Sequence, residues 1–189
     1  SDVIRKITQN AEVTTIAGEN NEDGYIDGPV ADARFNTPRG LAETDDGTIY
    51  VVDAGNHAIR KISNDMVSTL AGNGTNGFAD GQGTSAIFNA PHSIAVDNAG
   101  NLYVADGGNQ RIRKVTPDGV VTTIAGNGDI GLVDGPGPDA EFGVNVRGIA
   151  VDDNQNIYVS DTSNHVIRML INTGNGYEVI TLAGLANNP

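Results

Sequence analysis

The sequence has no cysteine and no tryptophan among its 189 residues. Without cysteine the chain cannot form a disulfide, a zinc–thiolate site or a thiol nucleophile. It also has no run near the ~18 consecutive apolar residues that a membrane-spanning helix requires. These absences exclude cysteine chemistry and an apolar helical span within the sequence, and they leave polar side chains to carry any function.

Basic residues are few. The chain has 11 Lys and Arg and 24 Asp and Glu, which gives a formal net charge of −13 at pH 7. A protein that binds nucleic acid neutralises a row of phosphates with clustered Lys and Arg. The composition therefore predicts no nucleic acid partner. The acidic residues are spread along the chain as turn aspartates and do not form an acidic tail.

Glycine is abundant, with 25 residues, and some glycines recur with a fixed period. An apolar residue followed by Ala-Gly occurs four times about 54 residues apart, and so does an Ile-Arg pair. The alanines are Ala17, Ala71, Ala125 and Ala183, and the arginines are Arg5, Arg60, Arg113 and Arg168. A repeat of this length indicates one supersecondary unit written several times.

Each repeat contains four strand candidates, which in the second copy cover residues 92–98, 101–106, 111–116 and 120–126. The first is a nearly continuous apolar run, and turns rich in Asn, Asp, Gly and Pro separate the others. Four short antiparallel strands repeated at intervals of about 40–60 residues are typical of a β-propeller blade. No stretch has the period of a long amphipathic helix.

The repeat predicts a single all-β domain over residues 1–189, a propeller of about three and a half four-stranded antiparallel blades. A half-blade covers residues 1–18 and supplies only third and fourth strands, so we expect fourteen strands. The blades cover about 37–72, 90–126 and 145–184. An open arc of this size leaves apolar faces in water, at roughly 25 cal/mol per Å². We therefore expect either a piece of a longer chain, with further blades, or a homo-oligomer.

Segments of about twenty residues join successive blades and share an Asp-Gly pair, an alanine and a phenylalanine. We expect the phenylalanines to anchor each segment over the gap between blades: Phe35, Phe88 and Phe142. We expect the aspartates to cap turns: Asp27, Asp80 and Asp134. Long connections are also where propellers commonly place function.

The repeated motifs resemble the NHL repeat. The three copies read NTPRGLAETDDGTIYVVDAGNHAIRKI, NAPHSIAVDNAGNLYVADGGNQRIRKV and NVRGIAVDDNQNIYVSDTSNHVIRML. The long connections are similar to those of NHL repeats in bacterial secreted and surface proteins. The resemblance implies a propeller that usually closes a ring of about six blades. It also implies a secreted or cell-surface location, and it is specific for fold more than for function.

Three residues occupy equivalent positions where the chain enters the first strand of each blade: Arg39, His92 and Arg147. In a propeller this position lies at the mouth of the central channel. The three residues differ although the frame around them is repeated, which favours a tailored ligand-binding site. The alternative is that a wet channel mouth accepts any polar residue.

Asp and Asn recur at the end of each second strand and in the turn that follows: Asp53, Asn56, Asp106, Asn109, Asp161 and Asn164. A functional interpretation makes them a metal or substrate ring. Their presence in every copy favours a structural role in the turn and between blades, because an active site needs asymmetry. We expect the repeated third-strand arginines to form exposed ion pairs with a neighbouring blade, worth about 0–1 kcal/mol each.

No metal site and no cofactor is predicted. Calcium is the one metal whose oxygen ligands the acidic turns offer: Asp45, Asp46, Asp97, Asp152 and Asp153. These turns match no EF-hand loop. Of the three histidines only His92 is placed toward the channel, so a zinc site with several histidines is excluded within this sequence.

Two functions remain open. The first is a non-enzymatic module for protein or ligand binding or for self-assembly, part of a larger bacterial secreted or surface protein. The second is a propeller enzyme, a metal-assisted lyase or a lactonase, acting at the channel mouth. The sequence favours the first, because no nucleophile motif is present and no catalytic residue can be assigned.

Overall fold

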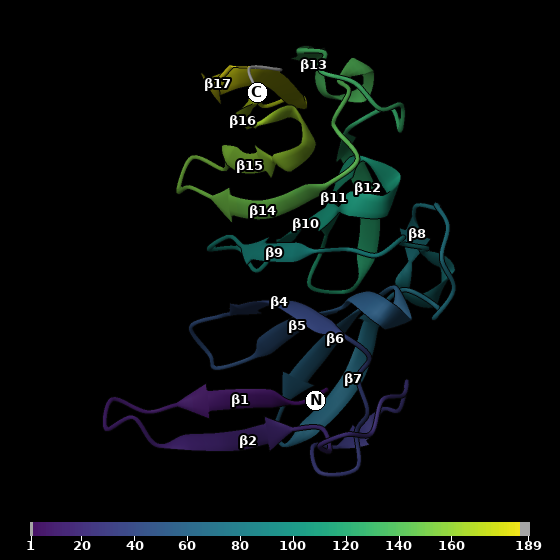
Figure 1. Cartoon of the computed structure of the whole chain (residues 1–189), viewed down its shortest axis with the longest axis vertical. Helices are drawn as coiled ribbons and strands as arrows, with labels where there is room; N and C mark the ends of the chain where they lie inside the picture. The colour runs from purple at the N-terminus through teal and green to yellow at the C-terminus, as the bar shows by residue number, and fades with distance from the viewer. Residues whose placement is uncertain (1, 186–189) are drawn as a thin grey trace.

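In the computed structural model, which describes residues 2–185, the chain forms antiparallel β-sheets that follow one another along an arc (Figure 1). The N-terminal sheet has two strands, β1 (Ile4–Ile7) and β2 (Val13–Ala17), and each of the other three has five. The predicted all-β propeller architecture is confirmed. The first and last sheets lie at opposite ends of the arc, so the described residues do not close a ring (Figure 1).

We name the three large sheets blades 1, 2 and 3 in chain order, and the N-terminal sheet the half-blade. Blade 1 consists of β3 (Gly28–Pro29), β4 (Pro38–Glu43), β5 (Ile49–Asp53), β6 (Ala58–Ser63) and β7 (Met66–Ala71). Blade 2 consists of β8 (Gly81–Gln82), β9 (Ser93–Val96), β10 (Leu102–Asp106), β11 (Arg111–Val115) and β12 (Val120–Ala125). Blade 3 consists of β13 (Gly135–Pro136), β14 (Val146–Val151), β15 (Ile157–Asp161), β16 (Val166–Asn172) and β17 (Tyr177–Gly184).

The helical elements among residues 2–185 are single 3-10 turns of three residues each. They are η1 (Ala54–Asn56), η2 (Gly83–Ser85), η3 (Gly107–Asn109), η4 (Gly137–Asp139) and η5 (Thr162–Asn164). Three of them connect neighbouring strands within a blade: η1 joins β5 to β6, η3 joins β10 to β11, and η5 joins β15 to β16. None of the helices in this part of the chain has the length and hydropathy that a membrane crossing requires.

The structure has three strands more than the fourteen expected, namely β3, β8 and β13. Each has two residues, comes from the long segment before a blade and pairs with the outer strand of that blade. In blade 1, for example, Gly28 pairs with Val67 and Pro29 with Met66. Two residues leave no alternation in the sequence, so pattern analysis does not detect such strands. They hold each long segment against the blade's outer edge.

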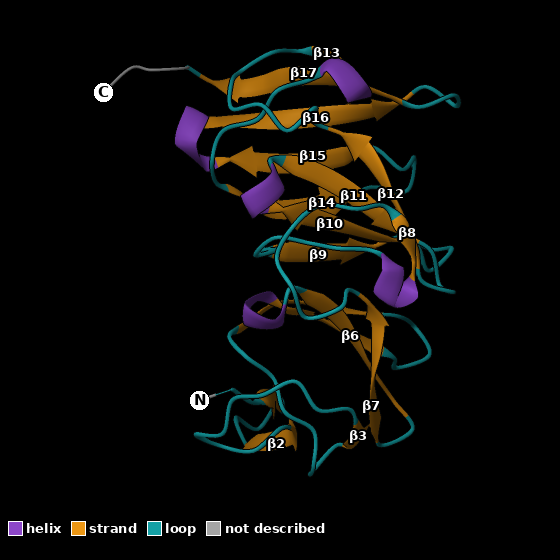
Figure 2. Ribbon diagram, turned by 90° about the vertical axis from the view of Figure 1, so that its right-hand side faces the viewer, coloured by secondary structure: helices purple, strands orange, loops and turns teal. Residues whose placement is uncertain are grey.

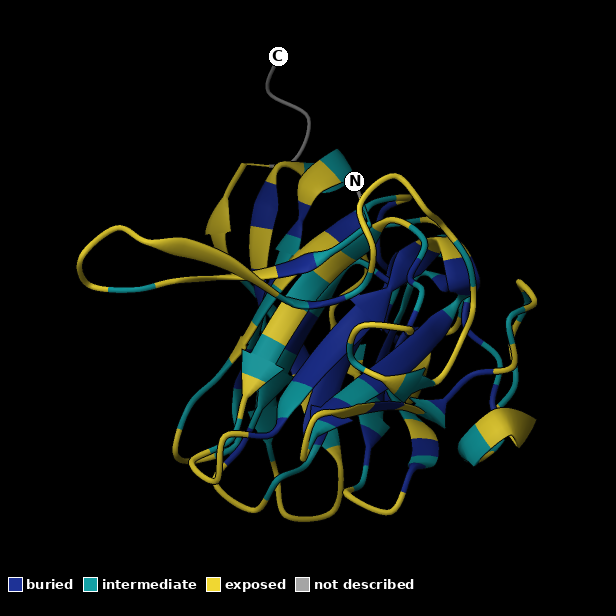
Figure 3. Cartoon of the chain, turned by 90° about the horizontal axis from the view of Figure 1, so that it is seen from below, coloured by how far each residue is buried: buried dark blue, intermediate teal, exposed yellow. Residues whose placement is uncertain are grey.

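The core lies between successive sheets, which stack as layers (Figure 2). Between blades 1 and 2, Tyr50 and Val52 of β5 belong to one apolar cluster with Leu102 and Val104 of β10. Phe88, fully buried, belongs to the same cluster, so the expected anchor over the gap is present there. Figure 3 shows buried residues along the central strands, and exposed residues in turns and along the hairpin of β1 and β2. Burial between layers thus determines the direction in which the central strands of the stacked blades face.

One arginine lies at the centre of each blade, with its side chain fully buried: Arg60, Arg113 and Arg168. In blade 2, Arg113 Nη1 donates to Asp106 Oδ2 at 2.8 Å and Nη2 donates to Asp80 Oδ1 at 2.7 Å. Asp106 belongs to the same blade, and Asp80 belongs to the segment that leads into it. The expectation of exposed pairs with a neighbouring blade is therefore wrong. We call each arginine with its two aspartates an arginine cluster.

The inner aspartate of each cluster joins the segment that enters the blade to the turn after the second strand. In blade 2, Asp106 accepts the backbone N–H of Asn89 at 2.9 Å and the side-chain amide of Asn109 at 2.8 Å. Asn109 also donates to the carbonyl of Gly77 at 2.7 Å. The same contacts surround the corresponding pairs of the other blades: Asp53 with Asn56, and Asp161 with Asn164. Burial raises the pKa of Asp53 and Asp106, and these donors oppose that rise.

The outer aspartate connects the long segment to the fourth strand. Asp80 Oδ2 accepts the backbone N–H of Thr123 at 3.0 Å, where the pairing of β11 with β12 shifts register. Its equivalents make the same contact: Asp27 with Thr69, and Asp134 with Thr181. The expectation that these aspartates cap turns is wrong, because their carboxylates are used across the blade.

We expect Arg113→Met to lower the free energy of unfolding by about 3–5 kcal/mol, because it leaves the buried carboxylate of Asp106 without its charge partner. Chemical denaturation followed by circular dichroism measures the change. Arg5→Met is the matched control, since Arg5 has the same repeat position but is exposed, and it should cost no more than about 0.5 kcal/mol. Equal losses in the two variants would contradict the role of the arginine cluster.

Candidate ligand site at the channel mouth

The inner strands β4, β9 and β14 lie side by side, with β9 in contact with both of the others. A Cβ on Gly40 would lie 2.8 Å from the Cα of Ser93, so β4 and β9 approach backbone to backbone. Arg39, His92 and Arg147 occupy equivalent positions at the starts of these strands. The close approach of the strands brings the three side chains to one rim, as the repeat register predicts. We call this set the rim site.

Arg39 and His92 are in direct contact across the gap between blades 1 and 2. Arg39 Nη1 lies 2.6 Å from His92 Nδ1 and 3.0 Å from His92 Nε2. A guanidinium can only donate, so the imidazole accepts through an unprotonated nitrogen. Arg39 itself is exposed, as is Arg147, whereas His92 is partly buried. The rim site therefore offers two water-accessible guanidinium groups on either side of a half-buried imidazole.

Burial and the two neighbouring arginines keep His92 neutral. Burial lowers the pKa of the His92 imidazole, and the positive charges of Arg39 and Arg147 lower it further. Arg147 acts on the imidazole as a nearby charge and not through a hydrogen bond. At pH 7 the rim site thus carries the charge of two arginines, with an imidazole that can gain a proton when a negative charge arrives.

Gly107, at the start of η3, makes room for His92. A Cβ at this position would lie 2.5 Å from His92 Cδ2 and 2.9 Å from the carbonyl oxygen of Val146. The equivalent residues of the other blades are Ala54 and Thr162, where no histidine stands at the rim. Sequence reasoning did not assign Gly107 to the site. The signal was available, because only the second copy has two glycines in this turn.

His57 positions the segment that leads to His92. Its Nδ1 accepts the backbone N–H of Ala90 at 2.9 Å, which ties the turn after β5 to the entry of blade 2. Burial lowers the pKa of His57, which favours the neutral, accepting imidazole. The backbone of His57 has φ 51°, in the left-handed region that the turn requires. Sequence analysis did not predict this contact between blades.

The repeated Asp and Asn residues do not join the rim site. Asp53, Asp106 and Asp161 are buried inside their blades, where their oxygens accept the donors of the arginine clusters. Their partners Asn56, Asn109 and Asn164 donate into the loops. These contacts recur in all three blades, whereas His92 and Gly107 occur in one.

The acidic turns that could attract calcium use their oxygens locally. Asp97, for example, accepts the backbone N–H groups of Ala99 at 2.9 Å and Asn101 at 2.8 Å. Burial alone would raise the pKa of Asp97, but the hydrogen bonds from Asn101 and Tyr103 outweigh it and lower that pKa. Within residues 2–185, no group of three or more His, Cys, Asp or Glu residues is arranged to hold a metal ion.

Sequence comparison matches the NHL repeat to residues 35–62, 88–115 and 145–168. Human NHL repeat-containing protein 3 is 33% identical over 120 residues, which cover 61% of this chain and 31% of that protein. The chain spans less than a third of the length of the curated relatives it matches.

Solved structures with the same architecture include a binding protein and an enzyme. An auxiliary nutrient binding protein from Bacteroides thetaiotaomicron VPI-5482 gives a TM-score of 0.69 at 26% identity, over 89% of this chain and 41% of that one. A catalytically inactive virginiamycin B lyase from Staphylococcus aureus gives 0.61 at 14% identity, over 100% and 50%, and this likeness concerns the fold alone. Each matched repeat covers the inner three strands of one blade. The chain belongs to the NHL-repeat family of β-propeller proteins.

Proposed function

We propose that the chain is a non-enzymatic propeller module that binds a ligand through its carboxylate, sulfate or phosphate group at the rim site. The observation that carries the proposal is the meeting of Arg39, His92 and Arg147 on one rim of a chain with net charge −13. In such a chain, positive charge concentrated at one place attracts an anion against the overall field.

The chemistry of the three side chains suits an anion. A guanidinium presents its N–H donors as a planar fork, which matches the two oxygens of a carboxylate or phosphate. Arg39 has no carboxylate within ion-pair distance among residues 2–185. Its guanidinium contacts the neutral imidazole of His92 instead. Its charge is therefore available to a ligand.

The likeness to the Bacteroides nutrient binding protein supports binding as the role of the module. At 26% identity and a TM-score of 0.69 it is a relative of the same architecture whose described role is binding. By extension we propose that this chain also serves within a larger secreted or cell-surface protein, because its long connections resemble those of bacterial secreted and surface NHL proteins. Detection of the full-length protein in fractionated cells and culture medium tests the location, and recovery only from the cytosol would contradict it.

The alternative function is an enzyme of the lyase or lactonase type, and one observation favours it. A neutral imidazole between two guanidinium groups could accept a proton from a bound, anionic substrate. The two functions differ in what His92→Gln does. If the chain is a binding module, the His92→Gln variant keeps its affinity for anions at pH 8. If the chain is an enzyme, the same variant loses turnover of every substrate.

We expect Arg39→Met and Arg147→Met each to weaken sulfate binding by about three- to tenfold, because each removes a charged donor from the rim. Isothermal titration with sodium sulfate at constant ionic strength measures the affinity. Lys61→Met is the matched control, since it changes the net charge equally but lies on β6, away from the rim. Equal weakening in all three variants would mean that sulfate responds to net charge only.

We expect sulfate affinity to rise as the pH falls from 8 to 5.5, because protonation of His92 adds a third positive charge at the rim. The folded-state pKa of His92 is lowered, so in the absence of the anion the proton costs folding stability below pH ~6.5. Bound sulfate, which keeps its charge over this range, raises that pKa again. Titration at several pH values tests the linkage, and His92→Gln should flatten the profile. A profile unchanged in His92→Gln would contradict the assignment.

A further inference from the structure

His57 makes a hydrogen bond that joins blade 1 to the segment that enters blade 2. Its Nδ1 accepts the backbone N–H of Ala90 at 2.9 Å, so the neutral imidazole carries its proton on Nε2. The chain after β7 packs closely against the backbone of His57, because a Cβ on Gly72 would lie 2.5 Å from the His57 carbonyl oxygen. The imidazole is therefore held in place, and the hydrogen bond exists only while Nδ1 has no proton.

The same contact occurs between the half-blade and blade 1, with a different acceptor. Asp2 occupies the repeat position of His57, and Thr37 occupies that of Ala90. Asp2 Oδ1 accepts the backbone N–H of Thr37 at 2.8 Å. In both junctions the N–H belongs to the residue directly before a proline. The repeat thus uses one side chain of a blade to hold the entry segment of the next blade.

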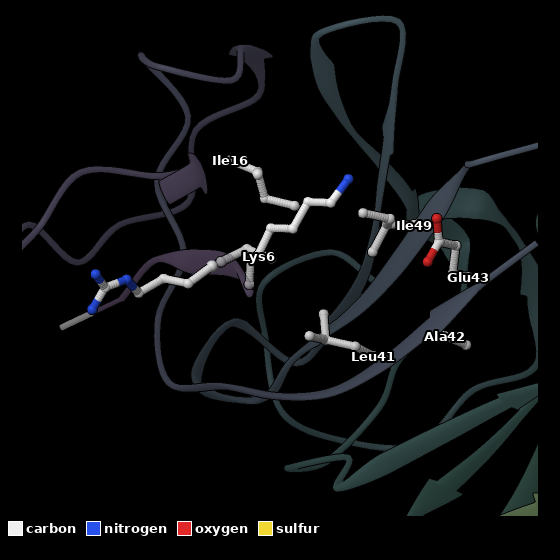
Figure 4. Close-up of a pocket in the computed structure, with 8 residues that line it drawn as sticks. Lys6, Ile16, Leu41, Ala42, Glu43 and Ile49 are labelled. Atoms are coloured by element: carbon white, nitrogen blue, oxygen red, sulfur yellow. The ribbon is translucent and has the colours of Figure 1, made fainter. Parts of the chain in front are cut away.

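This contact does not follow from close packing of the sheets. Between the half-blade and blade 1, Figure 4 shows Ile16, Leu41 and Ile49 around a groove of about 370 Å³. Leu41 is 49% exposed in this groove. The sheets therefore do not close on one another along the whole junction, although the hydrogen bond to the entry segment is made.

The junctions differ in how their acceptor responds to a proton. A carboxylate accepts throughout the neutral range, as Asp2 does, whereas an imidazole nitrogen stops accepting once it is protonated. Between blades 2 and 3 the equivalent residue is Gln110, which donates to the carbonyl of Gly107 in its own turn at 2.9 Å. Among the junctions that the structure describes, the one with His57 is thus the one whose contact depends on a proton near neutral pH.

Ala90 is held in a strained backbone conformation. Its φ is 43°, and a residue other than glycine stays at positive φ only while its surroundings hold it there. Pro91 follows, and a residue before proline prefers an extended backbone. When the hydrogen bond to His57 is lost, Ala90 therefore has a more favourable conformation to adopt.

The movement is confined to two residues beside the rim site. On one side, the backbone N–H of Asn89 donates to Asp106 Oδ1 at 2.9 Å. On the other side, the backbone N–H of His92 donates to the carbonyl of Ala105 at 2.9 Å. Residues 90 and 91 lie between these two fixed points, so a change in their backbone alters how His92 is presented at the rim.

The turns and strands next to His57 carry both charges and neutral titratable groups. They are Asp23, Tyr25, Asp53, Arg60, His92, Asp106 and Arg113. The aspartates and arginines of the two clusters among them pair with each other at 2.7 and 2.8 Å. Burial, and none of these charges, lowers the pKa of His57. The imidazole is therefore neutral above its ordinary value of ~6.5 and gains a proton only below it.

We propose that His57 is a pH-dependent latch between blades 1 and 2. The neutral imidazole holds Ala90 and so fixes the entry segment of blade 2. In the protonated imidazole Nδ1 becomes a donor that faces another donor, so the bond breaks and Ala90 moves toward an extended backbone. The effect on anion binding rests on the proposed function of the rim site, because this segment carries His92.

Hydrogen exchange of the Ala90 amide in the full chain tests the latch. NMR measures it from about pH 7.5 to about pH 5, and each rate is divided by the intrinsic rate at that pH. We expect protection to fall by about tenfold or more, with the same midpoint as the titration of the His57 ring, because the amide loses its acceptor. The Thr37 amide is the internal control, since its acceptor is a carboxylate, and its protection should change less than twofold.

His57→Asn is the matched variant. Asparagine keeps an acceptor oxygen near the position of Nδ1, tolerates the φ of 51° and has no proton to gain. In this variant the Ala90 amide should stay protected over the same pH range. An equal loss of protection in His57→Asn, or no loss in the wild type, would overturn the latch.

Sulfate affinity tests the link between the latch and the rim site. At about pH 5 the wild type should bind sulfate about threefold or more weakly than His57→Asn, and at about pH 7.5 the two should bind equally, because only the wild type releases its entry segment. Equal affinities at both pH values would overturn the control of the rim by His57. No sulfate binding by either protein at any pH would contradict the proposed function instead, and the exchange of Ala90 would still decide the latch.

Discussion

The structure depends on a charge pair that is taken out of water once in each blade. Burying a guanidinium with a carboxylate is costly unless every donor and acceptor is satisfied, and each arginine cluster satisfies them with two aspartates, an asparagine and carbonyls of the long segment. The buried arginine does not make the blade more stable than a well-packed apolar residue at the same position would. It makes one arrangement of the loop acceptable, because any other leaves a buried charge unpaired. The loops that carry the rim are held by this requirement.

Much of the fold could be predicted because its signals are local and repeated. The alternation of apolar and polar residues predicted the four strands of each blade, and the repeat period predicted the number of blades. The arginine clusters could not be predicted in the same way, since Asp80 lies 33 residues before Arg113 in a segment without regular alternation. An arginine repeated on a strand is typical of a solvated surface, and only the loop folded over it makes it a core residue. The two-residue strands were missed for a related reason, as their pairing partner alone defines them.

For the rim site, the sequence predicted the positions of the residues but not their interactions. Its three residues were located from register, because equivalent positions of a repeat must lie at equivalent places on the ring. What register could not show is that burial and two neighbouring arginines keep His92 neutral. Nor could it show that Gly107 leaves space for the His92 ring and that His57 fixes the segment leading to it. Those effects arise between blades, where one copy departs from the others. The symmetric residues thus build the frame, and the asymmetric ones give it chemistry. The half-blade is a third case, in which a repeated residue, Arg5, keeps its position but not its partners.

The account stands on the claim that the arginine clusters hold the long segments to the blades as firmly as the strands hold one another. Native-state hydrogen exchange of the backbone amides of Asn36, Asn89 and Gly143 tests it directly, since each donates to the inner aspartate of its cluster. The account predicts that these amides exchange within about tenfold of those in the central strands, because both open only when the blade unfolds. Exchange more than about a hundredfold faster, with the strands still protected, would show that the loops open on their own and would contradict it.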